Sequence, residues 1–90
     1  MQLFWREHKI GFRLILENEN NEQEVGMIRK TPRGFDAMAK TFGYDPGRAQ
    51  KDISSFEEAK DFVESFHPWE MFVGSVDLEV ETEIRPVPQG

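Results

Sequence analysis

The chain has 90 residues, a formal net charge of −6 and 38% hydrophobic residues, including eight phenylalanines and two tryptophans. This length and composition indicate one domain with a modest core, because a fully disordered chain carries less apolar content. The absence of cysteine excludes disulfides and thiolate metal sites, and no apolar run approaches the roughly 20 residues of a membrane-spanning helix.

The N-terminal part of the chain predicts strands. Residues 1–7 lack the basic start and long apolar stretch of a signal peptide, so we expect a cytoplasmic location. Leu3-Phe4-Trp5 is a candidate short strand. Apolar and polar residues alternate over 12–17, which predicts a further strand. The asparagine-rich segment 18–22 then predicts a loop with a tight turn, because asparagine tolerates a left-handed backbone.

A second hairpin is predicted from residues 25–30 and 35–41, which flank Thr-Pro-Arg-Gly at 31–34. Proline and glycine at these positions favour a type I turn followed by a bulge. That turn would place Lys30 opposite Asp36 as a cross-strand ion pair. The core face would then hold Val25, Met27, Phe35, Ala37 and Ala39, and the other face Ile28 and Met38.

The main helix is predicted over about 55–67, after a loop over 42–51. Ser55 can cap this helix, with Glu58 completing a capping box. Apolar side chains recur at helical spacing and form one stripe, which consists of Phe56, Ala59, Phe62, Val63 and Phe66. Pro68 is expected to end the helix, with one further turn before the next glycine.

Strict alternation over 76–84 predicts a last strand with one buried face and one acidic face. Two prolines then end the sheet and leave 86–90 as a frayed tail. Together these elements predict an α+β fold, in which an antiparallel sheet of three to five strands carries one main helix on one face. We expect a single domain over 1–90, with its folded core over 1–85.

Charge is distributed unevenly along the chain. Residues 29–51 contain six basic and two acidic side chains (+4), whereas 52–90 contain two basic and ten acidic ones (−8). Basic residues with interleaved aromatics suit nucleic acid, although the acidic residues of 76–84 could instead neutralise these cations across the sheet. The candidate partner-binding residues are Arg29, Lys30, Arg33, Tyr44 and Arg48.

Catalytic chemistry has little support in the sequence. The two histidines show no metal-ligand spacing, and helix capping accounts for Ser54 and Ser55. An enzyme would require His67, Glu70 and a third polar group to meet in one cleft. We therefore expect no catalytic residue, metal or cofactor, and a small non-enzymatic binding or accessory domain that contacts a partner protein or itself; nucleic-acid binding is the alternative.

Three short motifs follow one another in the middle of the chain: Gly-x-Ile-Arg at 26–29, Gly-Phe-x-Ala at 34–37 and Ser-Phe-Glu-Glu-Ala at 55–59. Their order resembles a strand–strand–helix pattern found in small uncharacterised bacterial domains, over residues 24–66. The resemblance implies the β-β-α order and carries no catalytic or binding residue.

Overall fold

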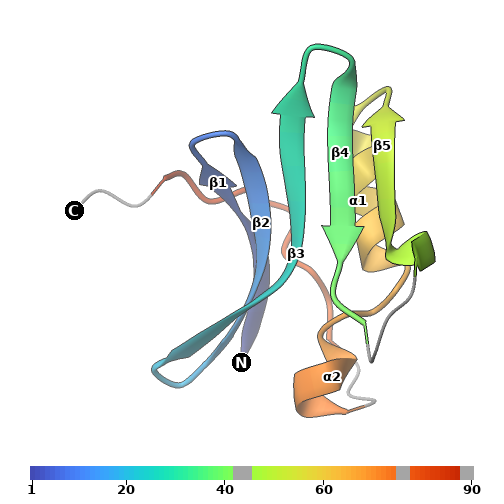
Figure 1. Cartoon of the computed structure of the whole chain (residues 1–90). Helices are drawn as coiled ribbons and strands as arrows, with labels where there is room; N and C mark the ends of the chain where they lie inside the picture. Colours follow the sequence, from blue (N-terminus) through green and yellow to red (C-terminus); the bar gives the residue numbers. More distant parts are fainter. Residues whose placement is uncertain (42–45, 75–77, 88–90) are drawn as a thin grey trace.

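The computed structural model describes residues 1–41, 46–74 and 78–87 and shows one five-stranded antiparallel sheet with helix α1 on one face (Figure 1). Its elements are β1 (Gln2–His8), β2 (Gly11–Asn18), β3 (Asn21–Thr31), β4 (Gly34–Ala39), the 3₁₀ turn η1 (Pro46–Arg48), β5 (Ala49–Ile53), α1 (Phe56–Glu64) and α2 (Glu70–Val73). The strands lie in the order β1-β2-β3-β4-β5, so each pairs with its neighbour in sequence. This confirms the predicted α+β fold. No helix within the described ranges is long and apolar enough to cross a membrane.

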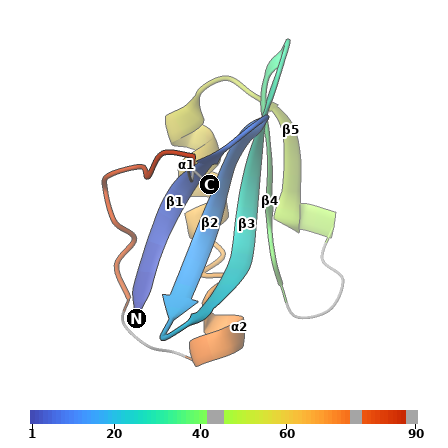
Figure 2. The same ribbon diagram turned by 90° about the vertical axis from the view of Figure 1, so that its left-hand side faces the viewer.

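The core lies between α1 and the sheet, and Figure 2 shows α1 on one side of the strands. Ala59 and Val63 of α1 are fully buried, and Phe56 lies edge-on against Trp5 with ring centroids 6.4 Å apart. The indole Nε1 of Trp5 donates to Glu64 at 2.9 Å, which fixes the C-terminal end of α1 to β1. The predicted apolar stripe of the helix is therefore confirmed.

Helix α1 begins as predicted and ends earlier. The Oγ of Ser55 accepts a hydrogen bond from the backbone N–H of Glu58 at 3.1 Å, so Ser55 is the N-cap. The carboxylate of Glu58 accepts from the hydroxyl of Ser54 at 3.1 Å, so the capping box is shared between two serines. The helix ends at Glu64 rather than near 67, and His67 has a left-handed φ of 47° before Pro68 starts the turn into α2.

The N-terminal hairpin confirms both strands predicted there. Leu3-Phe4-Trp5 forms the centre of β1, and the strand predicted over 12–17 is β2. The expected loop over 18–22 is shorter, because Asn18 pairs with Asn21 across a two-residue turn. The left-handed residue of that turn is Glu19, with φ 57°, and not an asparagine.

The register predicted for the β3–β4 hairpin is wrong by one residue. Thr31 pairs with Gly34, so only two residues form the turn. Arg29 therefore lies opposite Asp36 and makes the ion pair, at 3.1 Å, that was expected of Lys30. Lys30 points to the other face of the strand, where its Nζ lies 5.3 Å from the Phe12 ring centroid.

Gly34 is the first residue of β4, where the hairpin meets β5. Its φ of 135° suits only glycine, and a Cβ there would lie 2.3 Å from the carbonyl oxygen of Ile53. Gly34 is thus needed for the close approach of β4 to β5 rather than for a bulge in the turn. The Oγ1 of Thr31 closes the short turn, accepting from the N–H of Arg33 at 3.2 Å and donating to the carbonyl of Gly34 at 3.3 Å.

A bulge in β3 changes which side chains reach the core. Leu14 pairs with Gly26 and Ile15 with Glu24, so Val25 is an extra residue in β3. A bulge of this kind breaks the alternation of faces. Val25 is buried in the core as predicted, but Met27 is displaced from it. As a result, Ile28 and Ala37 lie on the core face, whereas Met27 and Met38 lie opposite each other on the other face.

The predicted loop over 42–51 is wrong for its last three residues, which belong to β5. The sequence of β5 lacks alternation because only Ile53 is buried, and the strand is irregular opposite β4. Asp52 at this irregularity has a φ of 58°. Residues 42–45 lie outside the described part of the chain.

The predicted last strand over 76–84 is wrong for its described residues, 78–84, which form no regular strand. Instead the segment 78–87 runs along β1 with three backbone hydrogen bonds. Glu81 N–H donates to Leu3 O, Arg85 N–H to Trp5 O and Glu7 N–H to Arg85 O, at 2.8–2.9 Å. The predicted burial is confirmed in part. Leu78, Val80 and Ile84 pack against the core and Glu79 and Glu83 are exposed. Thr82, predicted on the buried face, is exposed, and Glu81, predicted on the exposed face, is partly buried. Residues 76–77, and 88–90 of the expected tail, lie outside the described ranges.

Gly26 sets the distance between α1 and the sheet. A Cβ at this position would lie 2.5 Å from Cγ1 of Val63. The Gly-x-Ile-Arg motif at 26–29 therefore begins with glycine for a packing reason: the side chain of Val63 occupies the space that a Cβ at position 26 would need.

We expect Gly26→Ala to lower the free energy of unfolding by about 1–3 kcal/mol, the usual cost of overpacking a core. In Gly26→Ala/Val63→Ala the clash is absent, so the loss should be smaller than the sum of the two single losses. Urea denaturation of the three variants measures this coupling. Strict additivity would show that the two residues do not share one space.

Candidate partner-binding groove

The face of the sheet opposite α1, called the outer face here, is closed over β1 and β2. Phe4 and Ile15 lie opposite each other on this face and are buried. The guanidinium of Arg85 lies 3.6 Å from the Phe4 ring centroid and covers it. Arg6 bonds Glu22 at 2.8 Å, and a second arginine–glutamate pair crosses from β2 to β3. Arginines and their carboxylates therefore close this half without a helix.

The outer face is open over β3, β4 and β5. Met27, Met38 and Ala49 are neighbours across the three strands. They form the floor of a groove of about 250 Å³, called the methionine groove here. Its remaining lining residues are Arg29, Asp36, Ala37, Gln50 and Lys51. The groove thus has an apolar floor and a charged rim.

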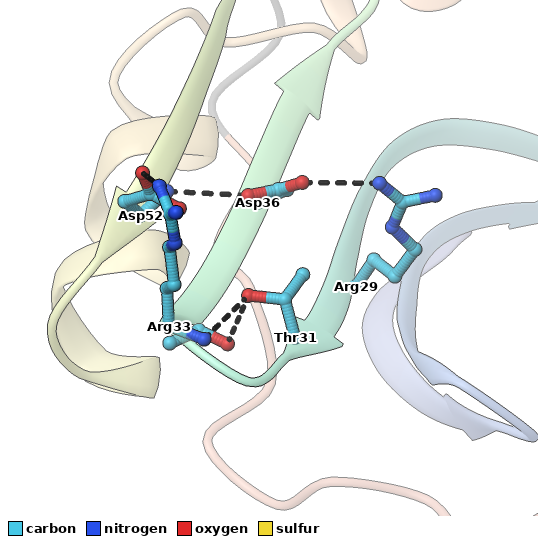
Figure 3. A network of polar contacts seen from close by, with 6 residues as sticks. Arg29, Thr31, Arg33, Asp36 and Asp52 are labelled. Atoms are coloured by element: carbon cyan, nitrogen blue, oxygen red, sulfur yellow. Dashed lines mark hydrogen bonds and ion pairs between the residues drawn. The ribbon is translucent and has the colours of Figure 1, made fainter.

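Asp36 is the centre of the polar network on this rim (Figure 3). One carboxylate oxygen accepts from Arg29 Nη2 at 3.1 Å, and the other accepts from the backbone N–H of Asp52 at 3.2 Å. The Asp52 N–H, followed by Arg29, lowers the pKa of Asp36 below its ordinary value of 3.8. Asp36 therefore holds both β3 and the irregular part of β5 against β4.

Of the five predicted partner-binding residues, the four that the structure describes do not form one patch. Arg29 lies on the groove rim, whereas Lys30 lies over the opposite face. Arg33 is at the hairpin tip, with its side chain 82% exposed and 3.8 Å from Asp52. Arg48 ends η1, directly before β5. Tyr44 lies outside the described residues.

The acidic C-terminal segment does not neutralise the basic residues, contrary to the alternative considered for the sequence. Segment 78–87 lies along β1, at the edge of the sheet away from β5 (Figure 1). The carboxylates that pair with Arg29 and Arg33 come from β4 and β5. Within the described part of the chain, four cations of this region make no ion pair: Lys30, Lys40, Arg48 and Lys51.

The sequence did not reveal the groove floor. The sequence pattern predicted Met27 in the core. It predicted Ala49 of the floor, and Lys51 of the rim, in a loop. The only signal was Met38 on the non-core face, because the bulge at Val25 that turns Met27 outward leaves no mark in the pattern.

A second, more polar cleft of about 220 Å³ lies where β4 ends beside the α1–α2 corner. It brings together Lys40, Thr41, His67 and Glu70, the convergence that an enzyme would require. However, His67 Nδ1 is 3.9 Å from Glu70 Oε2, beyond hydrogen-bond distance, and its side chain is 60% exposed. The imidazole stacks on the Trp69 ring and makes no hydrogen bond to Glu70, so the pair is not arranged for proton transfer and we assign it no catalytic role. The described ranges also contain no cluster of His, Asp and Glu that could hold a metal ion.

Comparison of the chain with protein-family models, with curated proteins and with solved structures found no match. The functional argument therefore depends on the geometry and charge of the groove.

Asp36→Asn should destabilise the protein at neutral pH, and this effect should disappear in acid. Because folding lowers the pKa of Asp36, the ionised carboxylate stabilises the protein at pH values above the pKa that Asp36 has in the unfolded chain. This stabilisation is lost as the pH falls through the pKa of Asp36 in the folded protein. Urea midpoints of wild type and variant should therefore differ at pH 7 and converge well below pH 3.8. Glu83→Gln, at an exposed carboxylate without an ion pair, is the control. A difference that is equally large in acid would contradict the role given to the ionised carboxylate.

Proposed function

We propose that this protein is a small, non-enzymatic, cytoplasmic binding domain that docks an acidic segment of a partner protein in the methionine groove. The supporting observation is the contrast within one face of the sheet. Over β1 and β2, arginines cover the apolar side chains, whereas Met27 and Met38 stay half-buried under no other element of the described chain. An apolar surface of this kind, with a polar rim, is typical of protein-interaction sites.

The residue types on the groove suit a protein ligand. Methionine side chains are flexible and polarisable, so they adapt to the shape of an inserted aliphatic group. Arginine and methionine are enriched at protein interfaces. Arg29 and Lys51 on the rim, with Arg48 nearby, attract carboxylates and thereby favour an acidic partner.

The same geometry disfavours nucleic acid, the alternative function. Bases bind single-strand sites by stacking on aromatic side chains, and no aromatic residue among those that the structure describes lines the groove. Phe35, one of the interleaved aromatics, instead packs against Phe56 with ring centroids 6.2 Å apart.

Methionine methyl NMR can test this function. A synthetic peptide that alternates leucine and glutamate should shift the ε-methyl signals of Met27 and Met38, but not those of Met1 and Met71, which lie outside the groove. Met38→Glu should weaken binding by at least about tenfold, or about 1.4 kcal/mol. Met71→Glu is the matched control and should leave the affinity unchanged.

Two results would count against the proposal. The first is the absence of shifts at Met27 and Met38 with the leucine–glutamate peptide. The second is equal binding of a leucine–lysine peptide, which would show that charge has no role. Shifts produced only by a single-stranded oligonucleotide would support the nucleic-acid alternative instead.

A further inference from the structure

We propose that the acidic segment received by the methionine groove belongs to a second copy of this chain. In this arrangement copies associate head to tail, with segment 78–87 of one copy against the groove of the next. The inference rests on the proposed function of the groove and names its partner.

The first support is the position of the two charged surfaces. Segment 78–87 runs beside β1, at the edge of the sheet far from β5 (Figure 2). The residues that line the groove come from β3, β4 and β5. A copy cannot fill its own groove with this segment, because the sheet separates the two. The same separation leaves both surfaces available to other copies at the same time.

The acidic surface is already held in an extended form. Leu78, Val80 and Ile84 pack against the core, so the backbone of the segment is ordered before binding. Glu79 and Glu83 are exposed and make no ion pair in the described part of the chain. A pre-ordered segment loses less conformational entropy on association than a disordered one.

The shape and composition of the acidic surface also match the groove. Residues 79–83 line a hollow of about 430 Å³, which has room for a long cationic side chain. On the groove side, Lys51 and Arg48 are long cations without carboxylate partners among the described residues. Val87 follows the acidic residues and is 45% exposed, so an aliphatic side chain is present for the methionine floor.

The net charge of −6 opposes association, but only weakly at physiological ionic strength. With a radius of gyration of 12.7 Å, two copies in contact have their centres about three Debye lengths apart, since the Debye length is about 8 Å. Contacts between Glu79 or Glu83 and Lys51 act within one Debye length. The local attraction is therefore screened less than the overall repulsion.

The two surfaces differ, so the interface is heterologous and each added copy leaves one groove and one acidic segment free. We thus expect a concentration-dependent series of oligomers rather than a closed dimer. In sedimentation velocity the average mass should rise above 10.5 kDa with concentration and return to 10.5 kDa in about 1 M salt, where the Debye length is about 3 Å.

Complementary variants test the assignment of the surfaces. Arg48→Glu/Lys51→Glu disables the groove, and Glu79→Lys/Glu83→Lys disables the acidic segment. Each variant alone should be monomeric, because its groove and its segment then carry like charges. An equimolar mixture should form oligomers in which the two variants alternate, because every groove then meets a segment of opposite charge.

Charge reversals elsewhere serve as controls. Lys9→Glu in the β1–β2 turn and Glu57→Lys on α1 alter exposed residues away from both surfaces and should self-associate like wild type. The Met71 methyl signal reports that each variant has folded.

Wild type that stays monomeric at every concentration would overturn self-association. If the leucine–glutamate peptide still shifted Met27 and Met38, the groove would bind a foreign acidic partner and the proposed function would stand. If neither occurred, both proposals would fail. A monomeric mixture of the two variants, with oligomeric wild type, would show that other surfaces hold the copies together.

Discussion

The close approach of α1 to the sheet at Gly26 is the contact on which the rest of the structure depends. Because β3 has no side chain at this point, Val63 reaches the backbone of the sheet. Phe56 of α1 can then contact Trp5 of β1 on one side and Phe35 of β4 on the other. Together with Trp69 and the apolar side chains of segment 78–84, the helix then covers one face. The outer face must be closed by other means, and its division into a closed half and an open half follows from that requirement.

Arginines take the place of a second helix over β1 and β2. A guanidinium is planar and weakly hydrated, so it can stack on Phe4 while its edge still bonds carboxylates. Arginines can cover the sheet in this way only where acidic residues lie close by, and β3 and segment 78–87 supply these residues. Over β4 and β5, the carboxylates of the described residues are those of Asp36 and Asp52, which are already engaged with the backbone, Arg29 and Arg33. The methionines there consequently remain uncovered.

Elements with regular periodicity could be predicted from the sequence. The stripe of α1, its serine cap and the alternating strand over 12–17 all repeat at a period that burial on one side imposes. The groove could not be predicted, because it arises from two breaks in that regularity. The bulge at Val25 reverses the faces of β3, and the requirement for glycine at position 34 comes from β5, which is distant in sequence. Segment 78–84 illustrates the opposite case, since its alternation predicts the inward side of Leu78, Val80 and Ile84 although, among residues 78–84, Glu81 alone bonds the backbone of β1.

The left-handed backbone of Asp52 has a consequence for how this protein can meet other chains. An added strand needs several consecutive residues with their N–H and C=O groups in line, and the bend at Asp52 leaves only Ala49–Lys51 straight. The far edge is shielded by the C-terminal segment. Neither edge of the sheet therefore offers an exposed strand to which further chains could add strands repeatedly, as they do in amyloid. Contacts between molecules must be made by side chains, which keeps them reversible and sensitive to salt.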